Sequence, residues 1–323
     1  MEILLLSIIA AMIPTAVYVG LIYWVDRYEK EPLWLLSAAF LWGAIPSIIA
    51  ALIFNTLFSI PFFLLGGELV GDLAGAVLIA PVVEETLKGI ALLLIYWFWW
   101  HHIDSWLDGI IYGAMVGMGF AMVENVFYFM SEFAAGGFEA WGINIFFRAV
   151  VFGLNHSLFT AMIGLGFAIA RLSQKRIVRW SAPILGWMAG VFLHFMHNLS
   201  ASLAADIPIF CLILPVNAWG GVLLTLVIIV WALIQERRWL RDYLQEEVAL
   251  GTLTAAQYET IQSGRRRLRY YLTKGASIFR VNRFFHLCSK LAYSKHHYEL
   301  LQDEESRQAV VKLRQAVRAA AYS

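Results

Sequence analysis

The sequence predicts an all-α membrane protein, a helical bundle of about seven spans with a small helical cytoplasmic tail. Of its 323 residues, 60% are apolar and 15% are charged, whereas a soluble domain carries about 25% charged residues. The apolar residues gather in segments of about 20 residues or more, the length that a helix needs to cross a bilayer. Lys and Arg are concentrated after these segments. We therefore expect a membrane domain at 1–234 and a basic tail domain at 235–323.

Seven segments meet the length criterion, and we expect each to be one span. The first lacks the basic start of a signal peptide and is followed by Arg27 and Lys30, which indicates a retained span. The last contains Pro208 and Pro215, which membrane helices tolerate when neighbours satisfy the freed backbone groups. The predicted spans are 3–25, 33–57, 73–99, 108–131, 143–170, 180–204 and 207–234.

The distribution of basic residues predicts the orientation, because cytoplasmic loops are enriched in Lys and Arg. The loops after the first and fifth spans and the start of the tail contain several of them, whereas 58–72, 132–142 and 205–206 contain none. We expect an N-terminus outside and a C-terminus in the cytoplasm.

The predicted fourth span carries Gly109, Gly113 and Gly117 at four-residue spacing, a pattern that lets helix backbones approach closely. In the tail, Thr254 is a predicted helix N-cap. The two cysteines form no disulfide framework or metal motif.

Polar side chains are concentrated in the third to sixth spans, although an ionisable residue inside a span costs about 2.5–3.5 kcal/mol. Given the rise of a helix and the predicted orientation, they fall within about two turns of one another in depth, in the outer half of the membrane. Four helices thus converge on one polar layer. Its members are Glu84, Glu85, Lys88, Glu124, Asn125, Asn155, His156, His194, His197 and Asn198.

Residues three or four apart share a helix face, so Lys88 can pair with Glu84 or Glu85. For Glu84 and Lys88 alone, a structural charge pair that neutralises two costly groups is as good an explanation as catalysis. For His156 alone, a structural hydrogen bond between helices is the simpler explanation. The shared depth of carboxylates and histidines favours chemistry, since these groups act as general bases.

These residues resemble the motifs of the PrsW family of membrane proteases and, more distantly, of the CAAX prenyl protease and bacteriocin-processing superfamily. The resemblance covers about residues 1–234. The wider superfamily has an arginine where this chain has Gly89, which favours PrsW and weakens any inference of a prenylated substrate. The matching motifs are Glu84-Glu85-x-x-Lys88, Phe152-x-x-x-His156, His194-x-x-x-Asn198 and the segment from Asp108 to Asn125.

The resemblance implies a glutamic-type peptidase without a cofactor or metal ligand. Glu84 or Glu85 would be the general base, with Glu85 preferred because Glu84 is better placed to pair with Lys88. His156 would orient or deprotonate the water, while His194 and Asn198 would donate hydrogen bonds to the oxyanion. We expect supporting roles for Lys88, Glu124, Asn125 and His197.

The resemblance also implies a membrane-anchored protein substrate, cleaved near the outer face of a bacterial cytoplasmic membrane, such as an anti-sigma-factor-like regulator. The expected partners are this substrate and the lipid bilayer, without nucleic acid. The oligomeric state is not predicted.

Three other functions fit the same residues. Two glutamates and several histidines could ligate zinc, but the H-E-x-x-H signature is absent and Lys88 would repel a cation. Buried Glu, His and Lys also form proton relays in transporters, which often show inverted repeats that this chain lacks. A non-catalytic membrane scaffold is the third.

Overall fold

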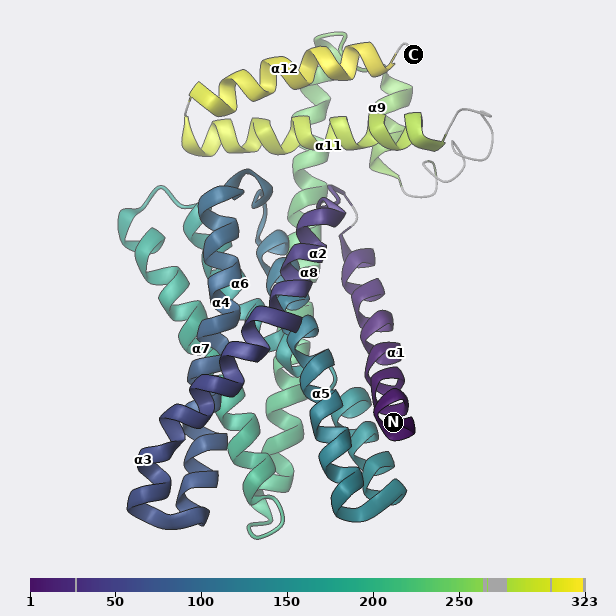
Figure 1. Ribbon diagram of the computed structural model, residues 1–323. Helices are drawn as coiled ribbons and strands as arrows, with labels where there is room; N and C mark the ends of the chain where they lie inside the picture. The colour runs from purple at the N-terminus through teal and green to yellow at the C-terminus, as the bar shows by residue number, and fades with distance from the viewer. Residues whose placement is uncertain (27, 264–265, 267–277, 303, 322–323) are drawn as a thin grey trace. The chain divides into compact units, whose positions relative to one another are not determined.

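The computed structural model describes residues 1–26, 28–263, 266, 278–302 and 304–321. Over these residues the chain contains helices and no strand, which confirms the predicted all-α bundle (Figure 1). Contacts divide the chain into two compact units, residues 1–25 with 31–228, and residues 26–30 with 229–323. The elements are α1 (Glu2–Val25), α2 (Leu33–Trp42), η1 (Gly43–Ser47), α3 (Ile48–Ala74), η2 (Gly75–Ile79), α4 (Ala80–Phe98), η3 (Trp100–His102), α5 (Trp106–Ile145), η4 (Phe146–Val151), α6 (Asn155–Arg171), α7 (Arg176–Leu203), α8 (Ile209–Ala249), α9 (Ala255–Gln262), α11 (Ile278–Leu301) and α12 (Glu304–Ala321).

Four helical stretches are long and apolar enough to cross a membrane: Glu2–Val25, Leu33–Phe98, Trp106–Arg171 and Ile209–Ala249. The second and third have 66 residues each, and a straight helix of that length would measure about 100 Å, three times the hydrocarbon thickness. Each therefore has to cross more than once.

Glycines make the reversals that this length requires. Gly67 (φ 72°, ψ −169°) and Gly137 (φ 68°, ψ −154°) take a backbone conformation that is essentially confined to glycine and costs another residue about 1–3 kcal/mol. The chain turns back at both points, so each stretch is a helical hairpin (Figure 1). The predicted loops at 58–72 and 132–142 were wrong in extent, because the helices continue almost to these glycines.

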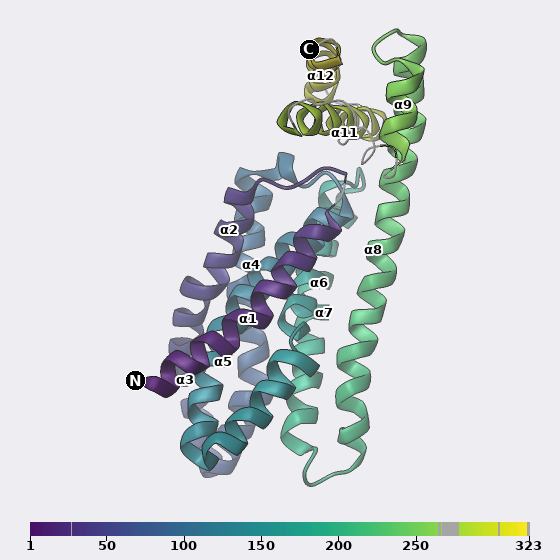
Figure 2. The same cartoon turned by 90° about the vertical axis from the view of Figure 1, so that its right-hand side faces the viewer.

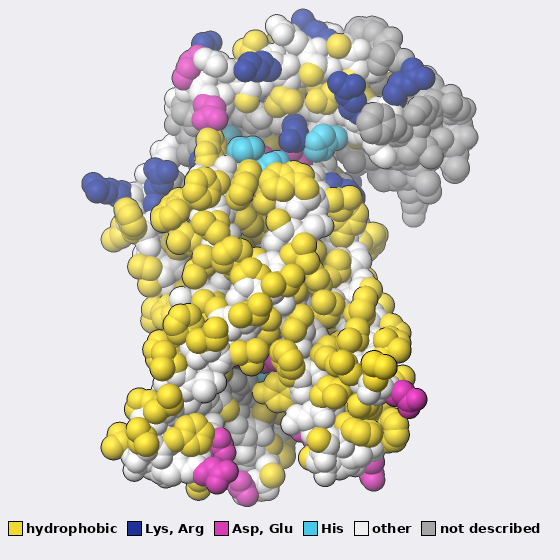
Figure 3. Space-filling model, viewed as in Figure 1, with side chains coloured by type: hydrophobic (Ala, Val, Ile, Leu, Met, Phe, Trp, Pro, Cys, Tyr) yellow, Lys and Arg dark blue, Asp and Glu magenta, His cyan; other side chains and the backbone are white. Residues whose placement is uncertain are grey.

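The sixth predicted span corresponds to α7, which is not among the four apolar stretches. His194, His197 and Asn198 lie within it and lower its mean hydropathy. In the described residues, α1, the two hairpins, α7 and α8 match the seven predicted segments in order. Figure 3 shows a broad surface of hydrophobic side chains over the first unit, as expected for helices that face lipid.

The glycines of α5 allow the close helix contact that their spacing predicts. A Cβ atom added at Gly109, Gly113 or Gly117 would lie 2.2–2.4 Å from a backbone oxygen of α6. At Gly117 that oxygen belongs to His156. The two backbones therefore touch beside a residue of the polar layer, and the glycine stripe determines where His156 lies.

The second unit is a helical domain with its own apolar core, which includes Leu240, Leu244 and Leu291. Tyr28, from the segment between α1 and α2, packs against this core. Helix α8, a single helix of 41 residues (Figure 2), belongs to the first unit up to Ile228 and to the second unit from Ile229. The predicted N-cap is confirmed, because the side chain of Thr254 accepts a hydrogen bond from the backbone N–H of Gln257.

Candidate active site

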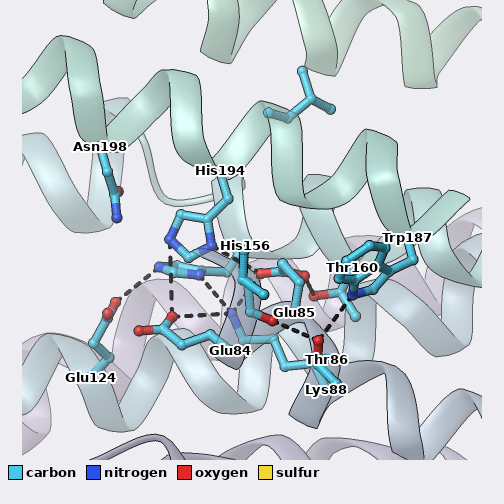
Figure 4. A network of polar contacts seen from close by, with 12 residues as sticks. Glu84, Glu85, Thr86, Lys88, Glu124, His156, Thr160, Trp187, His194 and Asn198 are labelled. Atoms are coloured by element: carbon cyan, nitrogen blue, oxygen red, sulfur yellow. Dashed lines mark hydrogen bonds and ion pairs between the residues drawn. The ribbon is translucent and has the colours of Figure 1, made fainter. Parts of the chain in front are cut away.

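Side chains from four helices meet inside the first unit (Figure 4). Helix α4 supplies Glu84, Glu85 and Lys88; Lys88 follows the two glutamates by four and three residues, so it can contact both. Glu124 of α5, His156 of α6 and His194 of α7 complete a network of hydrogen bonds and ion pairs. The convergence expected from the common depth of these residues is thus present.

Lys88 and Glu85 form the buried centre of this network. Both side chains have 0% exposure, and Lys88 Nζ lies 2.8 Å from Glu85 Oε1. His194 Nδ1 lies 3.1 Å from the same oxygen, and Thr160 donates its hydroxyl to Glu85 Oε2 at 2.9 Å. Both oxygens of Glu85 are therefore engaged by donors. Lys88 is farther from Glu84, at 3.6 Å, so the expectation that Lys88 pairs preferentially with Glu84 was wrong.

Glu84 differs from its neighbour in having an available oxygen. Its Oε1 accepts a hydrogen bond from Asn55 Nδ2 at 3.1 Å. Its Oε2 is buried without a hydrogen-bond partner, and its nearest charged or basic neighbours are Lys88 Nζ at 3.6 Å and His194 Nε2 at 3.9 Å. A buried acceptor without a donor is costly. The contacts therefore favour Glu84 over Glu85 as the group that receives a proton.

The two histidines have matching arrangements. His156 directs Nε2 toward Glu124 Oε2 at 2.9 Å and Nδ1 toward Lys88 Nζ at 3.1 Å. His194 directs Nδ1 toward Glu85 and leaves Nε2 facing Glu84. A ring nitrogen within hydrogen-bond distance of a carboxylate donates to it, so the network assigns the proton to Nε2 of His156 and to Nδ1 of His194. Nε2 of His194 lies 3.9 Å from Glu84 Oε2, which is too far for a hydrogen bond. His194 therefore presents a lone pair toward Glu84.

A second cluster lies beside Glu124. Arg148 of η4 contacts Glu124 Oε2 through Nη2 at 2.5 Å and Asn125 Oδ1 through Nε at 3.0 Å. Its guanidinium also lies over the ring of Tyr128, 3.6 Å from the centroid. Glu124 thus bridges Arg148 and His156.

Three members of the site were missed by the sequence analysis, namely Arg148, Asn55 and Thr160. Arg148 gave the clearest signal, because it is an ionisable residue inside the predicted span 143–170, where a charge is costly unless another group pairs with it. Asn55, an amide among mostly apolar residues of α3, gave a weaker one. A threonine such as Thr160 gives none, since it often bonds its own helix.

Two predicted site residues bind elsewhere. Asn198 donates to the backbone oxygen of Ala76 at 2.8 Å, within η2, the π-helical segment that directly precedes α4. His197 contacts Asn155 Nδ2 at 3.0 Å and packs against the ring of Phe152. Figure 4 shows no contact from Asn198 to the network.

The composition of the cluster also allows for a metal ion. Glu84, His156 and His194 each offer a ligand atom, and these atoms lie within 4.8 Å of one another. Each histidine has its second nitrogen on a carboxylate, as metal-binding histidines commonly do.

The chain is a polytopic helical membrane protein with carboxylates, histidines and a lysine buried in one cluster. These groups are the general bases and the positive charge that an intramembrane hydrolase needs. The model of the family described as "PrsW family intramembrane metalloprotease" matches residues 31–234, and the chain belongs to this family. It is an intramembrane protease. The match ends before the second unit's helices α9, α11 and α12.

Curated relatives agree with this membership. Protease PrsW of Geobacillus kaustophilus (strain HTA426) is 30% identical over 58% of this chain and 76% of its own length. Protease PrsW of Clostridioides difficile (strain 630) is 31% identical over 57% and 74%. That of Bacillus subtilis (strain 168) is 30% identical over 53% and 72%. No solved structure matches the chain.

Proposed function

We propose that this protease hydrolyses a peptide bond of a membrane-anchored protein with a water molecule held between Glu84 and His194. The observation that carries the proposal is the pair of facing acceptors, Glu84 Oε2 and His194 Nε2, at 3.9 Å. Neither oxygen nor nitrogen can donate to the other, so a water molecule that donates to both would satisfy them. Glu84 then takes the proton as the water attacks the scissile carbonyl.

The other members of the cluster hold this pair in place. Glu85 fixes the ring of His194 through Nδ1, and Asn55 fixes the second oxygen of Glu84. Lys88 is buried 3.6 Å from Glu84 Oε2, and its positive charge stabilises the negative oxygen that forms during attack. His156, held by Glu124 on one side, keeps Lys88 directed at the site.

The three potential metal ligands do not fit a cation as they are arranged, because Lys88 lies among them. Its ammonium group is 3.1 Å from His156 Nδ1 and 3.6 Å from Glu84 Oε2. A zinc ion about 2.0–2.1 Å from the histidine nitrogen would be in direct repulsion with this charge. We therefore propose the metal-independent mechanism, with Lys88 supplying the positive charge.

The substrate we propose is a single-span regulator of the anti-sigma-factor type, cut near the outer face of a bacterial cytoplasmic membrane. The orientation predicted from the basic loops, with the N-terminus outside, supports this proposal, because the depth of Glu84, His156 and His194 in their helices then corresponds to the outer half of the bilayer. A cut there would release the extracytoplasmic part of the substrate.

Purified protein in lipid vesicles, incubated with a panel of labelled single-span proteins, tests the proposal. Wild type should give a defined product, with the scissile bond identified by mass spectrometry. Glu84→Gln and His194→Gln should each lower the rate by at least 100-fold, the scale of losing a general base. Glu68→Gln, an exposed matched control in α3, should cleave like wild type. Equal cleavage by Glu84→Gln and wild type would refute the assigned mechanism.

A further inference from the structure

Arg148 lies at the entrance to the irregular segment that precedes His156. It belongs to η4 (Phe146–Val151), a π-helical segment that ends when the N–H of Phe152 bonds the oxygen of Phe147. Residues 152–154 leave the helix, and α6 then begins at Asn155. Single π-helical turns occur frequently at functional sites. A residue of this segment is therefore well placed to act on the site.

Three contacts define the orientation of Arg148. Its side chain is 23% exposed, yet it meets Glu124, Asn125 and Tyr128 on one face of α5. A planar guanidinium held along one edge and over one ring has little rotational freedom. All three partners belong to α5, whereas Arg148 belongs to η4, so these contacts link η4 to α5.

Glu124 connects this arginine to the cluster through a single oxygen. Oε2 lies 2.5 Å from Arg148 Nη2 and 2.9 Å from His156 Nε2. A carboxylate oxygen has two lone-pair directions and can accept from both donors. If Arg148 is removed, the carboxylate loses one of its two anchors and His156 loses a fixed acceptor.

We propose that Arg148 is a positioning residue for the peptidase reaction, acting through Glu124 to hold His156 in its Nε2–H form against Lys88. The proposal rests on the proposed function, because His156 and Lys88 are part of that site. Arg148 touches neither the water nor the scissile bond. Its removal should leave substrate binding intact and reduce the chemical step.

Kinetics with one substrate separate this role from a general loss of structure. Arg148→Gln should lower kcat about 10–100-fold, the scale seen when a group that orients a metal-binding histidine is removed, with KM changed less than twofold. Arg148→Lys should recover part of the rate, because it restores one charged donor to Glu124. Arg179→Gln, an exposed arginine of α7, is the matched control and should behave like wild type.

A double-mutant cycle tests whether the effect passes through Glu124. If it does, Arg148→Gln combined with Glu124→Gln should be no slower than Glu124→Gln alone. If the double variant loses the product of the two single-variant losses in kcat, or if Arg148→Gln changes only KM, the proposal is overturned.

A spectroscopic measurement tests the same link without activity. In ¹⁵N-histidine-labelled protein in lipid, the resonances removed by His156→Gln identify the His156 ring. Wild type and Arg179→Gln should show Nε2 protonated, whereas Arg148→Gln should shift these resonances or mix the tautomers. Unchanged His156 resonances in Arg148→Gln would refute the proposal. If wild type cleaves nothing, the proposed function fails by itself and the resonances still decide the role of Arg148.

Discussion

Replacing Gly117 with alanine should disable the protease by moving His156. A Cβ atom at Gly117 would lie 2.2 Å from the backbone oxygen of His156, whereas carbon–oxygen contacts are about 3.3 Å at their closest. The carbonyl must therefore move by about 1 Å, since the clash is with backbone and no side chain can turn away. A displacement of 1 Å in a catalytic arrangement can cost about 100-fold in rate.

Two glycine variants isolate this effect. Gly109→Ala produces a similar clash, 2.3 Å from the oxygen of Gly164, but two helical turns away from His156. Gly20→Ala has nothing within 4 Å of the new Cβ. All three proteins should be compared for kcat in vesicles and for thermal unfolding, where overpacking costs about 1–3 kcal/mol.

We expect Gly117→Ala and Gly109→Ala to be destabilised to a similar degree, and Gly20→Ala to resemble wild type. Only Gly117→Ala should lose about 100-fold in kcat. If Gly109→Ala loses as much activity, the loss reflects separation of α5 from α6 in general. If Gly117→Ala cleaves normally, the placement of His156 by this contact is wrong.

Three further outcomes are expected. Glu85→Gln should lower the thermal stability of the protein by about 3–5 kcal/mol, because it leaves buried Lys88 with its closest partner uncharged, whereas Glu84→Gln should lower activity with little loss of stability. Exhaustive chelation should leave cleavage intact and elemental analysis should find no stoichiometric zinc; cleavage that is lost and then restored by zinc would contradict the arrangement around Lys88. In the second unit, burial and neighbouring His297 lower the pKa of His296 to about 4, against which Glu299 acts only weakly. The unfolded state therefore takes up a proton first, and stability should fall as the pH drops from about 6.5 to 4. Hydrogen exchange over α11 should show this slope in wild type and a shallower slope in His296→Phe, where His286, whose pKa burial also lowers, still contributes.

Local properties of the sequence were sufficient to predict much of this fold. Each apolar segment is recognisable by itself, and the order of α1, α2 to α4, α5 to α6, α7 and α8 follows the predicted spans. The reversal points were harder to predict, because the apolar residues run on past the expected ends and only the φ angles of Gly67 and Gly137 mark the turns.

The sequence was sufficient to predict most of the ionisable residues of the site, but not how they pair. A buried charge is costly wherever it lies, so Glu84, Glu85 and Lys88 stand out in a linear sequence. Whether Lys88 approaches one glutamate or the other depends on helix rotation and on neighbours from α3, α6 and α7. Spacing of three or four residues allows both pairs, and only the packed structure distinguishes them.

The pair of adjacent glutamates is best understood as two groups with different tasks. Consecutive residues of a helix point about 100° apart, so Glu84 and Glu85 cannot have the same neighbours. Glu85 turns toward α6 and α7, where Thr160, His194 and Lys88 saturate it. A base in that position would compete with three donors, including a lysine ammonium group at 2.8 Å, for the lone pairs of its carboxylate. Glu84 turns toward Asn55 of α3 and keeps one oxygen without a hydrogen bond. The same twist of the helix that gives Lys88 a stable partner therefore leaves the second carboxylate available for chemistry.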